Sequence, residues 1–304
     1  MLLSQPPIFA QPMYYIAFGF LYLLSLLPMR ILYVLSDFIY VIIYYVAGYR
    51  KKVVHQNLTI AFPEKSEEEK TKIAKRFYHN LTDTFLETIK LISASHAFIK
   101  KRFTANFEVL DELYDKGKKC QVHLGHTFNW EVGNVGMPLG AKHPIIIVYM
   151  PFENKTFNRI FLYLRSRTGT IMLPANDMRN AILPYRNTRY LLGLVADQNP
   201  GRPESSLWIQ FFSKPAPFVK APESGARRGN IPVVFCNLTR KKRGYYEGHF
   251  LLVEENPKDT AAGEITKKYV RFIEDAIRAN PDNWLWSHRR WKHDWKEEYG
   301  EVLD

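Results

Sequence analysis

A histidine and a glutamate stand five positions apart in residues 120–134, which read CQVHLGHTFNWEVGN. Neutral His126 can take a proton from a hydroxyl, and a carboxylate such as Glu131 can fix the imidazole tautomer and stabilise its charged form. On one helix five residues turn through roughly 500°, so the two side chains would not share a face. They can meet if His126 follows a strand and Glu131 opens the next helix. The alternative is a core histidine and a glutamate that favours a helix start.

Two further polar groups stand at the ends of apolar runs. Arg165 and Arg167 precede the strand-like TGTIML, and Asp197 and Gln198 follow the strand-like LLGLVA. Open α/β sheets build their sites just past the carboxyl ends of strands. The alternatives are a solvated helix end for the arginines and an ordinary turn for DQNPG. The absence of HExxH, CxxC and GxSxG motifs, with few glycine-rich loops, argues against metal, nucleotide and serine hydrolase sites, so the expected chemistry needs no cofactor.

Short apolar runs predict the strands of a central sheet. Most of these runs are continuous, as in a sheet covered on both faces, and helices between them would give an α/β layered domain with a mixed central sheet. The expected strands are residues 120–124, 145–149, 170–173, 190–196, 232–236 and 250–253.

Two amphipathic helices are expected on either side of this region. Ser66 and Glu69 have the spacing of a capping box, which predicts a helix start at this point. The helix would bury a stripe of Ile73, Phe77, Leu81, Phe85 and Ile89. A second helix is expected over residues 259–279, with a buried side formed by Ile265, Tyr269, Phe272 and Ile277.

The first fifty residues are rich in apolar side chains. Residues 13–27 carry no charge, and a second apolar run, 31–49, is interrupted by Asp37. We expect one membrane helix over residues 12–30 and a second helix in, or partly through, the membrane interface. The predicted organisation is membrane-anchor helices in 1–52 and an α/β domain in 53–304. Because lysine and arginine follow the first run and none precedes it, the body should face the cytoplasm.

The charge and the cysteines limit the partners and the compartment. The chain has 304 residues and a formal charge of +12, which indicates an anionic partner: nucleic acid, an acidic protein or a phospholipid surface. Aromatic residues make up 14% of the chain, which favours the membrane, and no RNA-binding or zinc-finger signature supports nucleic acid. Cys120 and Cys236 lie in apolar runs, so we interpret them as reduced core residues of a cytosolic domain.

Aromatic and basic residues alternate near the end of the chain, in PDNWLWSHRRWK. Tryptophan beside Arg289 and Arg290 suits a membrane interface with phosphate headgroups. Internal packing of at least one of Trp284, Trp286 and Trp291 is the alternative, and the two interpretations are compatible.

Taken together, these segments resemble the late lipid A acyltransferases, the lauroyl and myristoyl transferases within the wider lysophospholipid acyltransferase group. The resemblance covers nearly the whole chain: the apolar start, RKKVVHQNLTIAFPE, GHTFNWE as an H-x4-D/E motif, RSRTG, VADQ, FF with PAPF, and PDNWLWSHRRWK. The sequence departs from it in FFSKPAPFVKAP, where glycine is expected after the paired phenylalanines. The resemblance implies that His126 is the catalytic base and Glu131 its partner, that Arg167 or Arg165 binds substrate, and that Asp197 is a site carboxylate with Gln198 beside it.

The resemblance also implies a reaction and a location. The expected enzyme moves a fatty acyl chain from an acyl carrier protein thioester to a hydroxyl of a lipid A precursor, at the cytoplasmic side of a bacterial inner membrane. Acyl-CoA as donor, or a lysophospholipid or aminolipid as acceptor, is the alternative within the same class. A non-catalytic protein that holds anionic lipid is the alternative outside it.

Overall fold

The computed structural model describes residues 10–304, so the first nine residues of the expected anchor segment lie outside the described residues. Helix α1 (Ala10–Leu26) ends before Pro28, and α2 (Met29–Val41) continues as a π-helical segment, Ile42–Val46. Within the described part of the chain, Met29–Val46 is the one helix long and apolar enough to cross a membrane, judged by length and composition. The expected membrane helix over 12–30 is therefore wrong in its bounds, because Pro28 separates two helices.

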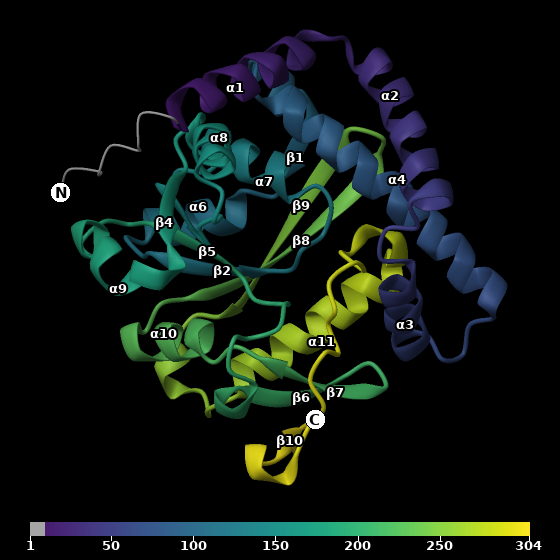
Figure 1. Ribbon diagram of the computed structural model, residues 1–304. Coiled ribbons are helices and arrows are strands. Elements are labelled where there is room, and N and C mark those ends of the chain that lie inside the picture. The colour runs from purple at the N-terminus through teal and green to yellow at the C-terminus, as the bar shows by residue number, and fades with distance from the viewer. Residues whose placement is uncertain (1–9) are drawn as a thin grey trace.

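Both N-terminal helices pack against the body of the protein (Figure 1). Helix α2 lies along α4 (Glu67–Leu91), and α1 contacts α4 and α8 (Lys155–Ser166). Their outward faces expose apolar side chains that include Ile16, Phe20, Leu23, Ile31, Val34 and Phe38. The N-terminal segment thus combines a body-packed face with an open apolar face.

Helix α4 begins at the predicted capping box. Ser66 Oγ accepts a hydrogen bond from the Glu69 N–H, and the Glu69 carboxylate accepts one from the Ser66 N–H. Ile73, Phe77 and Leu81 are buried as predicted. Phe85 is 55% exposed, so its predicted burial is wrong. The buried face shifts at this point to Leu86 and Glu87, because a stripe at every fourth residue drifts around a helix of 3.6 residues per turn.

The central sheet has seven strands in the order β1-β9-β8-β2-β5-β3-β4. Neighbouring strands pair in parallel except the hairpin of β8 and β9, so the sheet is mixed, as predicted. The strands are β1 (Phe103–Ala105), β2 (Cys120–Leu124), β3 (Ile145–Tyr149), β4 (Ile171–Pro174), β5 (Leu191–Val195), β8 (Val233–Lys242) and β9 (Tyr245–Glu254). Six of them were expected, with β8 and β9 longer than predicted, and β1 was missed.

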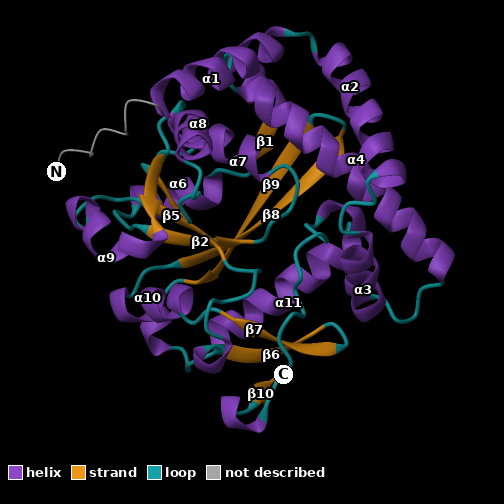
Figure 2. Cartoon of the chain, in the orientation of Figure 1, coloured by secondary structure: helices purple, strands orange, loops and turns teal. Residues whose placement is uncertain are grey.

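Helices cover both faces of this sheet (Figure 2). Alternate residues of β8 point to opposite faces: Val233 and Phe235 join one core cluster with α11, whereas Val234 and Cys236 join another with α6 and α7. The remaining helices are α3 (Lys51–Ala61), α5 (His96–Arg102), α6 (Glu108–Asp115), α7 (Trp130–Gly136), α9 (Met178–Ala181), α10 (Ala221–Gly229) and α11 (Glu264–Ala279). The predicted 259–279 helix starts later, at Glu264, and Phe272 is only partly buried.

A second sheet of three strands was not predicted. It consists of β6 (Leu207–Phe211), β7 (Lys214–Phe218) and β10 (Val302–Leu303), in the order β10-β6-β7. Phe212, in the turn between β6 and β7, has φ 57°, a conformation that glycine adopts more readily. The position after the paired phenylalanines, where the sequence departs from the family pattern, thus lies in the turn of a hairpin.

Candidate active site

His126 lies just past the carboxyl end of β2. Strands β2 and β5 are parallel neighbours with Leu124 opposite Val195, so the residues that follow them meet at the same edge of the sheet. Asp197 follows β5 and reaches His126 twice: its Oδ1 is 2.6 Å from His126 Nδ1, and its Oδ2 accepts a hydrogen bond from the His126 N–H at 2.8 Å. The histidine and this carboxylate form a dyad at the strand ends.

The carboxylate of Asp197 is fully buried and held in its charged form. Burial by itself raises its pKa, but the charge of His126 and the hydrogen bonds from His126 and Trp284 outweigh burial and lower the pKa to about 2. Since Asp197 occupies Nδ1, the other ring nitrogen of His126 is the one that can accept a proton from a substrate. The His126 side chain is 23% exposed, so the ring is accessible.

The C-terminal segment closes over this loop. Trp284 Nε1 donates to Asp197 Oδ2 at 2.7 Å. The backbone of residues 283–285 pairs with that of 126–128: the Phe128 N–H donates to the Asn283 carbonyl at 2.9 Å, and the Leu285 N–H to the His126 carbonyl at 3.1 Å. Residues more than 150 positions away along the chain therefore hold the segment that carries His126.

Glu131 lies in the first turn of α7, as predicted, but does not contact His126. Its carboxylate accepts hydrogen bonds from Arg165, with Arg165 Nε 3.0 Å from Glu131 Oε2, and from Trp130 Nε1 at 3.0 Å. The predicted role of Glu131 in orienting the imidazole is wrong, because Asp197 holds that position. The two carboxylates of the site therefore have different partners, Asp197 with His126 and Glu131 with Arg165.

The two arginines differ in their surroundings. Arg165 is the one that pairs with Glu131, with a further contact of 2.5 Å from its Nη2. Arg167 is half-buried, and its Nη1 is a buried atom without a hydrogen-bond partner among the described residues. Gln198, the remaining predicted site residue, follows Asp197 and is half-buried.

His123 and His126 occupy different environments although they are three residues apart. His123 is buried inside β2, where desolvation lowers its pKa to about 3, and its Nε2 lies 2.9 Å from the Gln121 side chain. It is therefore a neutral core residue. His126 lies beyond Gly125 at the open end of the strand.

The tryptophans of the terminal motif pack inside the protein. Trp284 and Trp286 are fully buried and meet edge to face, and Trp291 is 9% exposed. Arg290 is also buried, over the Phe218 ring at 4.2 Å. The membrane-interface interpretation is therefore wrong for these residues. It remains available for exposed Arg289.

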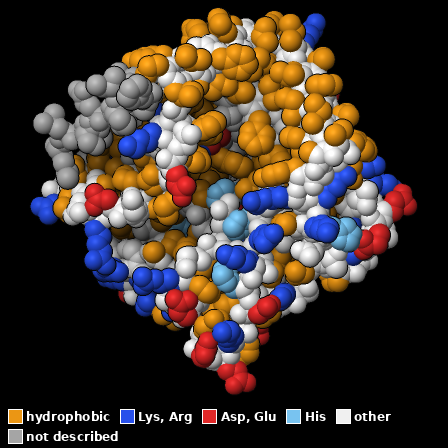
Figure 3. All heavy atoms as spheres, viewed as in Figure 1, with side chains coloured by type: hydrophobic (Ala, Val, Ile, Leu, Met, Phe, Trp, Pro, Cys, Tyr) orange, Lys and Arg blue, Asp and Glu red, His pale blue; other side chains and the backbone are white. Residues whose placement is uncertain are grey.

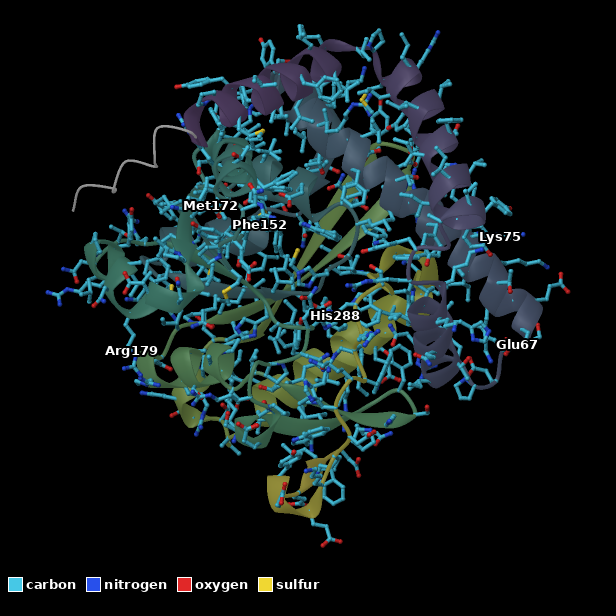
Figure 4. The ribbon with its side chains drawn as sticks, in the orientation of Figure 1. Glu67, Lys75, Phe152, Met172, Arg179 and His288 are labelled. Carbon is cyan, nitrogen blue, oxygen red and sulfur yellow. The ribbon has the colours of Figure 1, made fainter. Side chains whose placement is uncertain are left out.

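The face around the site is hollowed near its middle, with hydrophobic side chains lining the recess and histidine and basic side chains at its border (Figure 3). His288 lies near the centre of this view, with Phe152 and Met172 toward the β4 side (Figure 4). Its Nε2 accepts a hydrogen bond from the Asn199 N–H at 3.2 Å, close to the end of β5. A recess with apolar walls and a cationic border suits an amphiphile with an anionic head.

Sequence reasoning missed three functional candidates: Trp284 as a partner of Asp197, Asn129 as the cap of α7, and Glu87. Asn129 directly precedes a helix start, which was a usable signal. Trp284 and Glu87 reach the site from distant parts of the chain, and no local pattern marks them.

Comparison with known families decides the class of the protein. The family model of bacterial lipid A biosynthesis acyltransferases matches residues 5–293. The chain belongs to this family. Membership identifies it as an acyltransferase of lipid A biosynthesis, as the sequence resemblance predicted.

Relatives within the family are distant but matched over most of their length. The lipid A biosynthesis lauroyltransferase of Escherichia coli K12 is 24% identical over 285 residues, covering 91% of this chain and 90% of the relative. The palmitoleoyltransferase of the same organism is 24% identical over 258 residues, covering 80% and 79%. A lipid A biosynthesis acyltransferase of Haemophilus influenzae is 26% identical over 249 residues, covering 80% and 78%.

Proposed function

We propose that this acyltransferase moves a fatty acyl chain from an acyl carrier protein thioester to a hydroxyl of a lipid A precursor, with His126 as general base. The observation that carries the proposal is the His126–Asp197 pair, at 2.6 Å, at the carboxyl edge of the sheet. The free ring nitrogen takes the hydroxyl proton while the oxygen attacks the thioester carbonyl. The C–S bond then breaks, and the proton held by His126 passes to the leaving thiolate, which gives an ester and a free thiol.

Charge develops on the carbonyl oxygen during this attack and needs a donor. Arg167 presents a buried Nη1 with a free hydrogen-bonding capacity, and we assign it this role. Glu131 acts by holding Arg165 beside the site through the paired contacts of its carboxylate. Asp197 takes over the orienting role first expected of Glu131, while Gln198 remains a candidate substrate contact.

The charge of the chain supports both substrates. A formal charge of +12 complements an acidic carrier protein as donor and the phosphates of a lipid A precursor as acceptor. An acyl-CoA donor and a lysophospholipid or aminolipid acceptor are the competing substrates that the assay below separates.

The N-terminal helices support attachment to one leaflet of the inner membrane, from the cytoplasmic side. Helix α2 carries polar groups on the side that faces α4: Ser36 Oγ donates to Asp83 at 2.7 Å, and Asp37 pairs with Arg243. These contacts would be lost if α2 left the body to span the bilayer alone. We therefore propose that α1 and α2 lie in the interface with their exposed apolar faces toward lipid. The described part of the anchor, residues 10–52, and the domain of 53–304 then form one packed unit.

The reaction is tested by acyl transfer with purified, detergent-extracted protein. Lauroyl–acyl carrier protein and a lipid A precursor are mixed with wild type and His126→Ala, and thiol release and acylated lipid are measured. We expect a loss of roughly 10²–10⁴-fold, the usual contribution of a general base. His249→Ala, an exposed histidine of β9, is the control. Near-normal transfer by folded His126→Ala protein would contradict the mechanism, and preference for lauroyl-CoA or a lysophospholipid would replace the proposed substrates.

The mode of attachment is tested by thiol labelling in intact cells. Both native cysteines are buried, so a cysteine placed at exposed Arg30, in the first turn of α2, is a clean reporter. We expect an impermeant maleimide to leave Arg30→Cys unlabelled until the inner membrane is opened, as for the control Lys296→Cys in the body. Labelling of Arg30→Cys alone in sealed spheroplasts would show that α2 spans the membrane.

A further inference from the structure

Glu87 is a buried carboxylate that connects three parts of the fold. It lies on α4, is 4% exposed, and receives hydrogen bonds from three donors on other elements. Tyr33 Oη of α2 lies 3.0 Å from Oε1, and Tyr246 Oη of β9 and Asn129 Nδ2 lie 2.6 and 3.0 Å from Oε2. A buried carboxylate needs such partners, because an unpaired one is costly.

Asn129 connects Glu87 to the segment that carries His126 and Glu131. It stands between His126 and Glu131 and is completely buried. Its Oδ1 accepts hydrogen bonds from the N–H groups of Glu131 and Val132 at 3.1 and 3.3 Å, which caps α7. With Nδ2 directed at Glu87, the amide can turn in one way only, with Oδ1 toward the helix. Glu87 therefore sets the orientation of the cap that fixes Glu131.

A second contact group one helical turn earlier strengthens the same attachment. Asp83 accepts hydrogen bonds from Ser36 of α2 and from Arg240 and Arg243 of the β8–β9 hairpin. Asp37, His79 and Asp83 have the side-chain types of a metal site, but Arg240 and Arg243 already pair with these carboxylates, so we assign them no metal. The polar groups of α4 thus hold α2 on one side and the sheet on the other.

We propose that Glu87 is a positioning residue for acyl transfer, which orients Asn129 and through it the Glu131–Arg165 pair, and joins this segment to the lipid-facing helix α2 through Tyr33. The inference rests on the proposed function. Glu87 touches neither His126 nor Asp197 in the described structure; it acts on the segment that carries Glu131. The position of α2 and the orientation of the segment that carries Glu131 then both depend on the Glu87 carboxylate.

Exchanging the hydrogen-bond donor and acceptor between Asn129 and Glu87 tests this contact. Asn129→Asp keeps a side chain able to cap the helix, since aspartate caps as well as asparagine, but its carboxylate is repelled by Glu87 and is therefore displaced from the cap position. We expect kcat to fall roughly 10–100-fold, the scale of a small misplacement near a reacting centre. In Glu87→Gln with Asn129→Asp, the glutamine amide donates to the aspartate, so the hydrogen bond returns with its direction reversed. We expect the double variant to regain most of the kcat lost in Asn129→Asp, because residues in contact are non-additive.

Matched variants separate positioning from stability. Glu223→Gln changes another buried carboxylate, one that caps α11 by accepting from the Gly263 and Thr266 N–H groups. It should lower the melting temperature without the same loss of kcat. Tyr33→Phe leaves the Asn129 contact intact, so purified enzyme should keep most of its kcat in detergent and lose more on vesicles.

The outcomes distinguish this inference from the proposed function. If wild type transfers acyl groups and His126→Ala does not, yet the double variant is as inactive as Asn129→Asp or both follow only their melting temperatures, Glu87 is merely structural. If wild type shows no transfer, the proposed function fails instead. Hydrogen exchange at residues 131–136 gives a readout independent of activity: exchange should be faster in Asn129→Asp and return toward wild type in the double variant. Unchanged exchange in Asn129→Asp would overturn the proposal.

Discussion

Trp284 and Asp197 are 87 positions apart, yet the indole Nε1 donates to the carboxylate Oδ2 at 2.7 Å. The same oxygen also accepts from the His126 N–H. Two donors on one oxygen leave the other free to face the imidazole. The indole therefore belongs to the candidate site as well as to the core.

Replacing Trp284 with phenylalanine should weaken catalysis more than stability alone explains. The change removes a hydrogen bond to a charged group, worth about 1.5–3 kcal/mol, so kcat should fall by about tenfold or more. Trp286→Phe is the control, because the Trp286 indole is equally buried but donates to the Pro281 carbonyl. Kinetics and thermal melting of both variants decide the matter. Equal kcat losses at equal melting temperatures would refute a specific role for Trp284.

Gly125 lies close to the Asp197 carboxylate. A Cβ at this position would lie 3.1 Å from Asp197 Oδ2 and 3.0 Å from Ile273 Cδ1, so Gly125→Ala must shift the carboxylate or the Ile273 side chain by a few tenths of an ångström. We expect activity to fall by roughly tenfold, less than the loss that a full ångström of misplacement causes. Gly201→Ala, in the loop after Asp197, meets nothing within 4 Å and should remain active. A fully active Gly125→Ala enzyme would show that the dyad geometry is not required.

Acid should lower the unfolding free energy, partly because Asp197 becomes protonated. Its pKa falls from 3.8 to about 2 on folding, so its contribution to stability, about 2 kcal/mol, is present above pH 4 and disappears as the pH falls through about 2. Asp197→Asn lacks this contribution at every pH. The difference in unfolding free energy between wild type and variant should shrink as the pH falls below 4. Denaturant titrations across this range measure it, and a constant difference down to pH 2 would contradict the assignment.

Substitutions of the adjacent Arg289 and Arg290 should affect different properties, membrane binding and stability respectively. Arg290 is buried, where desolvation lowers its pKa to about 10, and it donates to Asn199 Oδ1 and to the Pro217 carbonyl. Arg290→Gln should lower the unfolding free energy by roughly 2–3 kcal/mol, since it leaves buried acceptors without a charged donor. Arg289→Gln should leave stability unchanged and reduce binding to anionic vesicles.

Vesicle flotation at two salt concentrations separates these effects. The loss of binding in Arg289→Gln should shrink with salt, because the screening length falls to about 3 Å at 1 M. Unchanged flotation of Arg289→Gln at low salt would remove this residue from the membrane surface.

The sequence predicted most of the sheet because buried parallel strands are continuous apolar runs. It also predicted Asp197 as a site residue, from its position after a strand. It could not pair Asp197 with His126, since that pairing depends on β5 lying beside β2 although β3 and β4 intervene in the chain. Proximity in sequence suggested Glu131 instead, and the ion pair with Arg165 shows where that carboxylate is used.

The missed elements have local causes. Strand β7 reads KPAPF, and its two prolines argue against a strand unless it lies at a sheet edge, as it does here. The tryptophans of WLWSHRRWK gave no sign of their direction, because an amphipathic ring suits a membrane boundary and a core equally. The contacts of the folded chain show that the segment is internal, among them those with α3, in which Asn57 Nδ2 donates to the Trp286 and His288 carbonyls.

Residues 283–285 complete the loop that holds His126 and Asp197. The ribosome adds them more than 150 residues after His126. Under the proposed function, a nascent chain whose apolar helices already lie against the membrane thus still lacks a finished dyad. Translation arrested before this point is expected to leave an inert polypeptide, so the order of synthesis itself delays acyl transfer until these residues have been made.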